Sequence, residues 1–406
     1  MNPLYRLAVK NLTRNPKRSV LTTTSMVAGV GVLVIGQAFI GGVNENIVVS
    51  SEEGTVGHVL ARPAGYPVTG RYAPLDKLID VNPAARALLD SEAVAWTGRV
   101  QFTPTAIHGA DSVRVRAVGF DPEGDPAVFP RAHWKTEGAF AASDLDEVTV
   151  SPSVARLLTV KPGDRIVLQV RTHRGAINAL EVKVSGIVST GNLGLDQLGI
   201  FVPKALTEKL TGADAPTHVA VKLRRRADAP DFKPRLQAAL GPKVEVATLQ
   251  EETAELLSLQ AVRQKALGVV VLILLALSAF GMANTFLMAA YERTREVGTL
   301  RAMGMTEASV VLLFVAEGAL IGLFGSLVGA AWGGSLAAWW STHPLNFAEL
   351  EKSSNGNLAI STLVYTQFRP GVVVAAVILG VVVAILASWY PARVASSMRP
   401  ADAVRA

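Results

Sequence analysis

This chain of 406 residues contains four long apolar segments. The hydrocarbon core of a bilayer, about 30 Å thick, takes roughly twenty helical residues, so each segment is long enough to cross a membrane as a helix. We expect these spans at residues 19–43, 266–291, 309–340 and 370–390. The first follows basic residues, as in a signal peptide, but it is longer than a typical signal and no small-residue cleavage site follows it cleanly. We therefore interpret it as a retained anchor.

The longest stretch outside these spans, residues 44–265, has the pattern of a mixed α/β domain with many short strands. "SVRVRAVGF" at 112–120 and "EVKVSGIVST" at 181–190 alternate with period two, as half-buried strands do. "KPGDRIVLQV" at 161–170 places a Pro-Gly-Asp turn before a β-branched run, and "SPSVARLL" at 151–158 predicts a short helix with a Ser-Pro start.

The end of this domain predicts a helix that runs on into the second span. "TLQEETAELLSLQAVRQKALG" opens with Thr248 and Glu251 in the spacing of a capping box and keeps helical character up to the apolar segment. A stiff outer helix that is continuous with a membrane helix can transmit motion.

Charge places the short segments relative to the membrane. Three segments rich in Lys and Arg alternate with segments richer in Glu, although Arg263 and Lys265 before the second span go against this trend. By the positive-inside rule the basic segments, and with them both termini, are cytoplasmic, and residues 44–265 lie outside. The basic residues are Arg6, Lys10, Arg14, Lys17 and Arg18, then Arg293, Arg295 and Arg301, then Arg393, Arg399 and Arg405. We further expect an outer loop at 341–369 and a cytoplasmic tail at 391–406.

The first 18 residues predict an amphipathic helix. Leu4, Ala8 and Leu12 share an apolar arc, whereas Lys10 and Arg14 fall on the opposite side. Such a helix can lie on an anionic inner leaflet. The alternative is an ordinary basic flank with accidental amphipathicity.

Composition fits a membrane protein with a sizeable polar part, because 50% of the residues are hydrophobic and 18% are charged. The net charge of +6 is mild. The chain has no cysteine, which excludes disulfides, Cys-ligated metals, thiol catalysis and a lipid-modified N-terminal cysteine.

Little in the sequence indicates catalysis. The six histidines show no close His-His or His-x-Glu spacing, so we expect no metal site. "DPEGDP" at 121–126 departs from a calcium loop at Pro126 and Ala132, and we interpret it as a solvated turn. The printed sequence contains neither a nucleophile elbow nor a phosphate-binding G-x-x-x-x-G-K-[ST] motif. We expect a non-catalytic chain that binds no ATP and no nucleic acid.

The third span carries a stripe of glycines. These residues share one helix face, which favours close packing against another helix, either in the same protomer or in a second one. They are Gly318, Gly322, Gly325, Gly329 and Gly333. Beside them lies Glu317, an intramembrane carboxylate. We expect it to pair with an Arg of the neighbouring cytoplasmic loop or to extend toward the membrane surface, since a proton relay would need further ionisable residues at this depth.

The loop between the second and third spans, residues 292–308, combines charges of both signs with an apolar ridge at Val297 and Leu300. We predict a short helix here that docks a partner, with Arg295 and Arg301 exposed. The alternative is a solvated hairpin loop.

Several segments resemble the FtsX/MacB/LolC-LolE class of ABC transporter permeases. "ERTREVGTLRAMGMTEASVVLLFVAEGALIGLFGSLVG" at 292–329 is similar to the motif that this class carries between its second and third spans, and "YPARVASSMRPADAVRA" at 390–406 to its terminal motif. "AVKNLTRNPKRSVLTTTSMVAGVGVLV" at 8–34 resembles its N-terminal entry. "SPSVARLLTVKPGDRIVLQV" and "VKVSGIVSTGNLGLDQLGIFVP" resemble its extracytoplasmic domain. The resemblance covers nearly the whole chain.

The resemblance implies a four-span membrane domain, a periplasmic domain with porter-like and sabre-like subdomains, and a dimer that binds two ATPase subunits. ATP and Mg would be bound on the ATPase, and the permease would act as a lever in the bacterial inner membrane. The second protomer is either an identical or a different chain, and a periplasmic adaptor or lipoprotein acceptor is a further expected partner. The coupling helix of the class falls on Glu292, Arg293, Glu296, Gly298, Leu300, Arg301, Ala302 and Gly304. We expect Arg295 of the same segment to take part in coupling to the ATPase as well.

Three functions follow from this resemblance. Our first expectation is lipoprotein release of the LolC/LolE type, because "EGTVGHVLARPAGY" at 53–66 resembles the opening of those periplasmic domains. The alternatives are MacB-like export of a drug or peptide, with the ATPase as a separate subunit, and an FtsX-like regulator that transmits force without transport. FtsX-like proteins usually have a much smaller outer domain, which disfavours the last.

Overall fold

The computed structural model describes residues 16–67, 73–131, 134–141, 146–343, 345–346 and 363–397. The chain forms two compact units: Met1–Val43, Leu259–Leu345 and Tyr365–Ala406 make up the first, and Asn44–Ser258 with Asn346–Val364 the second. The predicted amphipathic helix at 1–18 lies outside the described residues apart from its last three, and the tail beyond Ser397 lies outside them as well.

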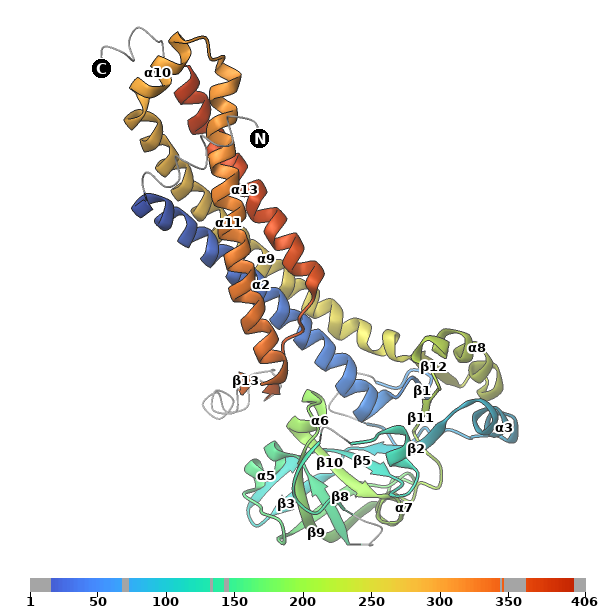
Figure 1. Cartoon of the computed structure of the whole chain (residues 1–406). Helices are drawn as coiled ribbons and strands as arrows, with labels where there is room; N and C mark the ends of the chain where they lie inside the picture. The colour runs from blue at the N-terminus through green and yellow to red at the C-terminus, as the bar shows by residue number, and fades with distance from the viewer. Residues whose placement is uncertain are drawn as a thin grey trace. The chain divides into compact units, whose positions relative to one another are not determined.

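Among the described residues, four helices are long and apolar enough to cross a membrane, and most of each helix belongs to the first unit. Each predicted span lies within one of them (Figure 1). They share one core, to which Met26, Met282, Phe314 and Ala384 each contribute from a different helix. The helices are α2 (Pro16–Ser51), α9 (Leu249–Glu292), α11 (Glu307–Thr342) and α13 (Pro370–Ser396).

The helices extend further than the apolar segments alone predict. The helix α9 begins at Leu249, so the predicted continuity between the outer helix and the second span is confirmed. The helix α13 passes through Pro391 and ends at Ser396, so the start of the predicted tail is helical. Of the predicted outer loop, the structure describes a two-stranded sheet of β13 (Leu345–Asn346) and β14 (Leu363–Val364), together with the segment that leads into α13.

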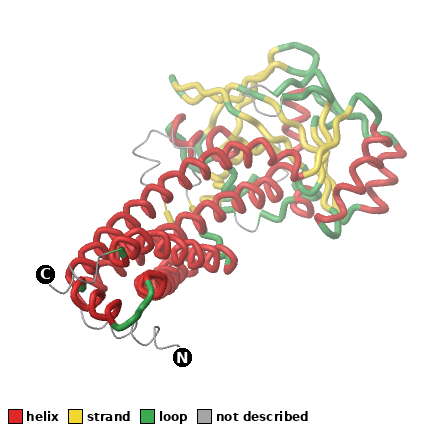
Figure 2. Tube along the Cα trace, turned by 90° about the horizontal axis from the view of Figure 1, so that it is seen from above, coloured by secondary structure: helices red, strands yellow, loops and turns green. Residues whose placement is uncertain are grey.

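The second unit is built on a mixed sheet, and Figure 2 shows the strands gathered in this unit. The strand order is β12-β1-β11-β2-β5-β10-β7-β9-β8-β3-β4, with β6 paired to β9. The pairs β5–β10 and β7–β9 are parallel. The strands are β1 (Val59–Pro63), β2 (Ala95–Phe102), β3 (Thr105–His108), β4 (Asp111–Arg114), β5 (Arg116–Phe120), β6 (Lys135–Gly138), β7 (Glu147–Val150), β8 (Arg165–Arg171), β9 (Ile177–Ser189), β10 (Gly199–Pro203), β11 (His218–Lys222) and β12 (Val244–Thr248).

The two largest of the hydrophobic cores described in this unit are separate. Leu89, Phe232 and Leu236 belong to the core that α3 and α8 form with β1, β11 and β12. Phe102 and Leu168 belong to the other, beneath α5 and α7. The helices of this unit are α3 (Pro83–Glu92), α4 (Asp125–Val128), α5 (Pro152–Leu158), α6 (Leu193–Leu198), α7 (Lys204–Thr211) and α8 (Ala229–Leu240), with a π-helix η1 (Glu52–Val56) and a 3₁₀ turn η2 (Arg226–Asp228).

Local signals in the sequence account for several element boundaries. The side chain of Ser151 accepts a hydrogen bond from the Val154 amide and caps α5, as predicted. The Pro-Gly-Asp turn before β8 is also confirmed: Gly163 has φ +102°, and the Lys161 amide donates to Asp164 Oδ2 at 2.7 Å.

Two expectations for this domain were wrong in part. The alternating stretch 112–120 is two strands, because the chain changes pairing partners at Val115: β4 pairs with β3, whereas β5 pairs with β2 and β10. Alternation reports which face a residue occupies, not which strand it pairs with. The "DPEGDP" stretch is also not a fully solvated turn, because Asp125 is buried and forms an ion pair with Arg99.

Candidate functional site

The hairpin between the second and third spans contains a short helix, α10 (Thr294–Ala302). It is narrower than the predicted 292–308. It ends at Ala302, and two residues later Gly304 has a φ of +97°, which glycine readily adopts. The Gly304 amide donates to the Arg301 carbonyl and the Met305 amide to the Leu300 carbonyl, both at 3.0 Å. This double closure is a Schellman motif, so the sequence itself fixes where the helix stops.

The helix α10 has two distinct faces. Val297 and Gly298 are buried, and Leu300 is partly buried, so the predicted apolar ridge packs inward. The opposite face carries charges of both signs and ends at Met303, which is 72% exposed. Its exposed residues are Glu292, Arg295, Glu296, Thr299, Ala302, Met303 and Gly304. An exposed face with mixed charge and an apolar end is suited to docking another protein.

Arg293, at the junction of α9 and α10, contacts the intramembrane carboxylate. Its Nη1 lies 3.1 Å from both carboxylate oxygens of Glu317. The two side chains are only 14% and 7% exposed. The predicted pairing of Glu317 with an Arg of the loop is therefore confirmed, and it joins the start of α10 to the first third of α11.

Arg301 joins the other end of α10 to α13. It donates to the Ser396 carbonyl in the last turn of α13 and to Glu307 Oε1 at the start of α11, both at 2.8 Å. A cation beside the C-terminus of α13 is stabilising, because that end of the helix dipole is negative. The expectation that Arg301 is exposed was wrong, because its side chain is 17% exposed. The exposed arginine of α10 is Arg295.

The glycine stripe of α11 packs against helices of the same chain. A Cβ on Gly318 would collide with Ser388, and one on Gly322 with Ala384, both in α13. A Cβ on Gly329 or Gly333 would lie 2.6 Å from a backbone carbonyl oxygen of α2, and one on Gly325 3.0 Å from the side chain of Met26. The stripe therefore lets α11 approach two neighbours within its own protomer.

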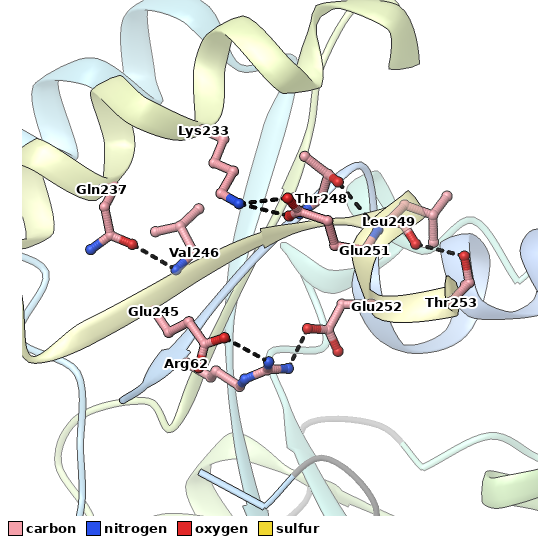
Figure 3. Close-up of polar contacts among 10 residues, drawn as sticks. All are labelled: Arg62, Lys233, Gln237, Glu245, Val246, Thr248, Leu249, Glu251, Glu252 and Thr253. Atoms are coloured by element: carbon pink, nitrogen blue, oxygen red, sulfur yellow. Dashed lines mark hydrogen bonds and ion pairs between the residues drawn. The ribbon is translucent and has the colours of Figure 1, made fainter. Parts of the chain in front are cut away.

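The start of α9 is tied to the sheet by polar contacts, which Figure 3 shows. The predicted capping box is present: the Thr248 amide donates to Glu251 Oε2 at 2.9 Å, and the Glu251 amide to Thr248 Oγ1 at 3.3 Å. Lys233 of α8 donates to Glu251 at 2.7 and 2.8 Å. On the other side, Arg62 of β1 is paired with Glu252.

The Arg62 contact was not predicted from the sequence, because 190 residues separate it from Glu252. The two side chains are 9% and 8% exposed, and Arg62 also reaches Glu245 across the strand pair at 3.2 Å. Burial raises the pKa of Glu252, and the charge of Arg62 opposes that rise. The first turn of α9 is thus held on two sides, by α8 and by β1.

Two protein-family models match the chain. Residues 19–239 match the MacB-like periplasmic core domain, and residues 268–400 match the FtsX-like permease C-terminal region. The first match alone covers more than half of the chain. The chain belongs to this family of ABC transporter permeases. The resemblance noted from the motifs is thereby confirmed, and so is the fold of four membrane helices with a mixed α/β domain.

The named relatives share only about a quarter of their aligned residues with this chain. The chain is 26% identical over 268 residues to the lipoprotein-releasing system transmembrane protein LolC of Xylella fastidiosa, with 64% of either chain covered. It is 24% identical over 243 residues to the macrolide export ATP-binding/permease protein MacB of Pectobacterium atrosepticum, covering 56% of this chain and 34% of that protein. The periplasmic region of MacB from Actinobacillus actinomycetemcomitans aligns with a TM-score of 0.36 at 12% identity, over 52% of this chain and 97% of that one.

The name of the MacB relative joins an ATP-binding part to a permease. With four apolar helices, family membership indicates a bacterial inner-membrane protein. The chain spans less than two thirds of the length of the LolC relative.

Proposed function

We propose that this permease relays ATP-driven motion of a separate ATPase subunit to its α/β domain, and that the motion releases lipoproteins from the inner membrane. The observation that carries the proposal is the structure of α10. One face is exposed and charged, whereas the other face and both ends are fastened to the bundle. A docking helix that is fastened in this way moves its neighbours when its partner moves.

The path of the motion follows from the contacts. Arg293 connects α10 to α11 through Glu317, and Arg301 connects it to α13 through Ser396. The helix α9 ends next to α10 and is a single helix back to Leu249, where Glu251 and Glu252 are tied to Lys233 and Arg62. A displacement of α10 therefore acts on three membrane helices, one of which starts in the α/β domain.

The remaining parts of the complex are proposed by the same reasoning. Two ATPase subunits would hold ATP and Mg, and a second permease protomer would complete the membrane part. The Lys and Arg residues of the terminal segments and of the α10 hairpin support a cytoplasmic location for all three, because the positive-inside rule counts Lys and Arg and not net charge. The α/β domain then faces the periplasm, where an adaptor or a lipoprotein acceptor would meet it.

The substrate class rests on the relatives. Lipoprotein release is favoured by the similarity to LolC, which covers more of this chain than the similarity to MacB does. The MacB relative favours export of a small molecule as the second candidate. A release assay with membranes that contain an acylated lipoprotein, compared with an efflux assay in the same reconstituted complex, separates the two.

The docking step is tested by Arg295→Glu. Arg295 is exposed, and surface changes usually cost within about 0.5 kcal/mol of stability, so the variant should fold and insert. A like-charge contact in an interface costs several kcal/mol, so co-purification of the ATPase should fall sharply. Arg225→Glu, at a side chain that is 79% exposed in the α/β domain, is the matched control. ATPase binding at the wild-type level in Arg295→Glu would refute docking on this face.

A further inference from the structure

Four aromatic side chains of the α/β domain form a compact group outside the coupling path. Neighbouring ring centroids lie 5.1 to 6.4 Å apart. Phe120, at the end of β5, and Phe201, in β10, are buried, whereas Trp134 and Phe140 are partly exposed. The group therefore reaches the surface of the domain on the side of Trp134 and Phe140.

The guanidinium of Arg131 lies against three of these four rings. Its Cζ lies 4.1 Å from the ring centroid of Phe140, 4.9 Å from that of Phe120 and 5.5 Å from that of Trp134. All three distances fall within the range of cation–π attraction, in which the negative face of a ring attracts a cation. Three or more rings around one cation are the arrangement by which proteins recognise organic cations.

Arg131 is held in an unfavourable state at this position. Its φ of +55° lies in the left-handed region, which residues with a side chain seldom adopt. Its Nε is buried and has no hydrogen-bond partner in the described part of the chain. Burial also lowers the pKa of Arg131, although Asp125 opposes that shift. Such features mark a side chain that another group could replace.

The surrounding charges would tolerate the departure of Arg131. Asp125 is already paired in a bidentate manner with Arg99, through Nε at 2.6 Å and Nη2 at 2.8 Å, and both side chains are buried. Arg131 is a second cation on the same carboxylate, with Nη2 at 3.0 Å. If Arg131 moved out to solvent, Asp125 and Arg99 would remain as a neutral pair, so no buried charge would be left without a partner.

We propose that Phe120, Trp134, Phe140 and Phe201 form a binding site for an organic cation, and that Arg131 is an internal occupant that the ligand displaces. The ligand class is a guanidinium or a methylated ammonium group, since both present a diffuse positive charge to ring faces. The site lies in the α/β domain and does not depend on the coupling role of α10.

The test uses the full chain, purified in a neutral maltoside detergent, with Arg131→Gly as the principal variant. Glycine adopts the same φ without strain, and the substitution removes the guanidinium from among the four rings. Isothermal titration with choline and with methylguanidinium should give Kd values at least about tenfold lower for Arg131→Gly than for the wild type. The uncharged isostere of choline, 3,3-dimethylbutan-1-ol, should bind at least about tenfold more weakly than choline.

Removal of one ring provides the second arm. In the Arg131→Gly background, Phe140→Ala should abolish the gain, whereas Phe129→Ala, at a ring that contacts Arg99 instead, should leave the cation preference in place. A folded Arg131→Gly chain that binds neither cation better than the wild type would overturn the proposal, as would equal binding of choline and its neutral isostere. Arg131→Asn is the second variant, because Asn also tolerates positive φ. Misfolding of both variants would show that Arg131 is an essential part of the core and would equally reject the proposal.

Discussion

Arg293 Nη1 is equidistant, at 3.1 Å, from the two carboxylate oxygens of Glu317. Arg293 lies between α9 and α10, whereas Glu317 lies ten residues after Glu307, the first residue of α11. One ion pair thus connects the junction of two helices to the interior of a third. Because both side chains are largely buried, the pair is a firm contact and not a surface ion pair of little consequence.

Glu317→Gln should destabilise the bundle. This change removes the Glu317 carboxylate that pairs with the buried Arg293 side chain, and breaking a buried pair costs about 3–5 kcal/mol. We expect a clearly lower melting temperature in nanodiscs. The matched control is Glu307→Gln, because Glu307 is 62% exposed and its removal leaves Arg301 bound to the Ser396 carbonyl. Equal melting temperatures for Glu317→Gln and the wild type would show that the pair is dispensable.

Arg301→Gln and Arg295→Gln should differ, although both remove one arginine from α10. Loss of Arg301 removes the hydrogen bond to the Ser396 carbonyl and the ion pair with Glu307, which costs about 1–3 kcal/mol. Loss of the exposed Arg295 should cost less than about 0.5 kcal/mol. The measurement is the melting temperature of each purified variant, and a larger loss at Arg295 would reverse the assignment of the two faces.

The sequence predicted the membrane helices well because their signal is local. A run of apolar residues of sufficient length determines a span without reference to the rest of the chain. The cap of α9 at Thr248 and the stop of α10 at Gly304 are local in the same sense, since each depends on a few neighbouring residues. The pairing of Glu317 was also predictable, because a buried carboxylate requires a partner and few were within reach.

Contacts between distant parts of the chain were not predictable in this way. Arg301 appeared as one of several basic residues in a short loop, and only the fold shows that it reaches Ser396. Arg62 and Glu252 meet because β1 and β12 are adjacent strands. Asp125 was misjudged for the same reason, since a turn-like sequence gives no sign that Arg99 lies beneath it.

Gly333→Ala should separate α11 from α2. A Cβ at this position would lie 2.6 Å from the Gly31 carbonyl oxygen, which belongs to the backbone and cannot move aside cheaply. We expect a loss of about 1–3 kcal/mol, as for other overpacked sites. Gly334→Ala is the control next to it, because among the described residues its Cβ would meet the Phe368 side chain at 3.5 Å, an ordinary contact. Similar melting temperatures for the two variants would refute the close approach of the helices.

His218 should make the α/β domain less stable in acid. Burial lowers the pKa of His218 from 6.5 to about 3, and the charges of Arg62, Arg116 and Arg99 act in the same direction. Below pH 6.5 the unfolded chain therefore binds a proton that the folded chain does not. Stability is lost as the pH falls from 6.5 toward 3, by up to about 1.4 kcal/mol per pH unit, or roughly 2 kcal/mol at pH 5.

The variant His218→Gln isolates this contribution, because Gln does not titrate. It loses the edge contact with Tyr66 at a centroid distance of 4.8 Å, so it should melt below the wild type at about pH 7.5. At about pH 5 the wild type alone bears the protonation cost, so the difference in melting temperature should shrink or change sign. Melting curves of the two full chains at both pH values provide the measurement. Other acid-sensitive groups are common to both chains and cancel in the difference, so a gap that stays constant with pH would mean that His218 is protonated in the folded domain as readily as in the unfolded chain.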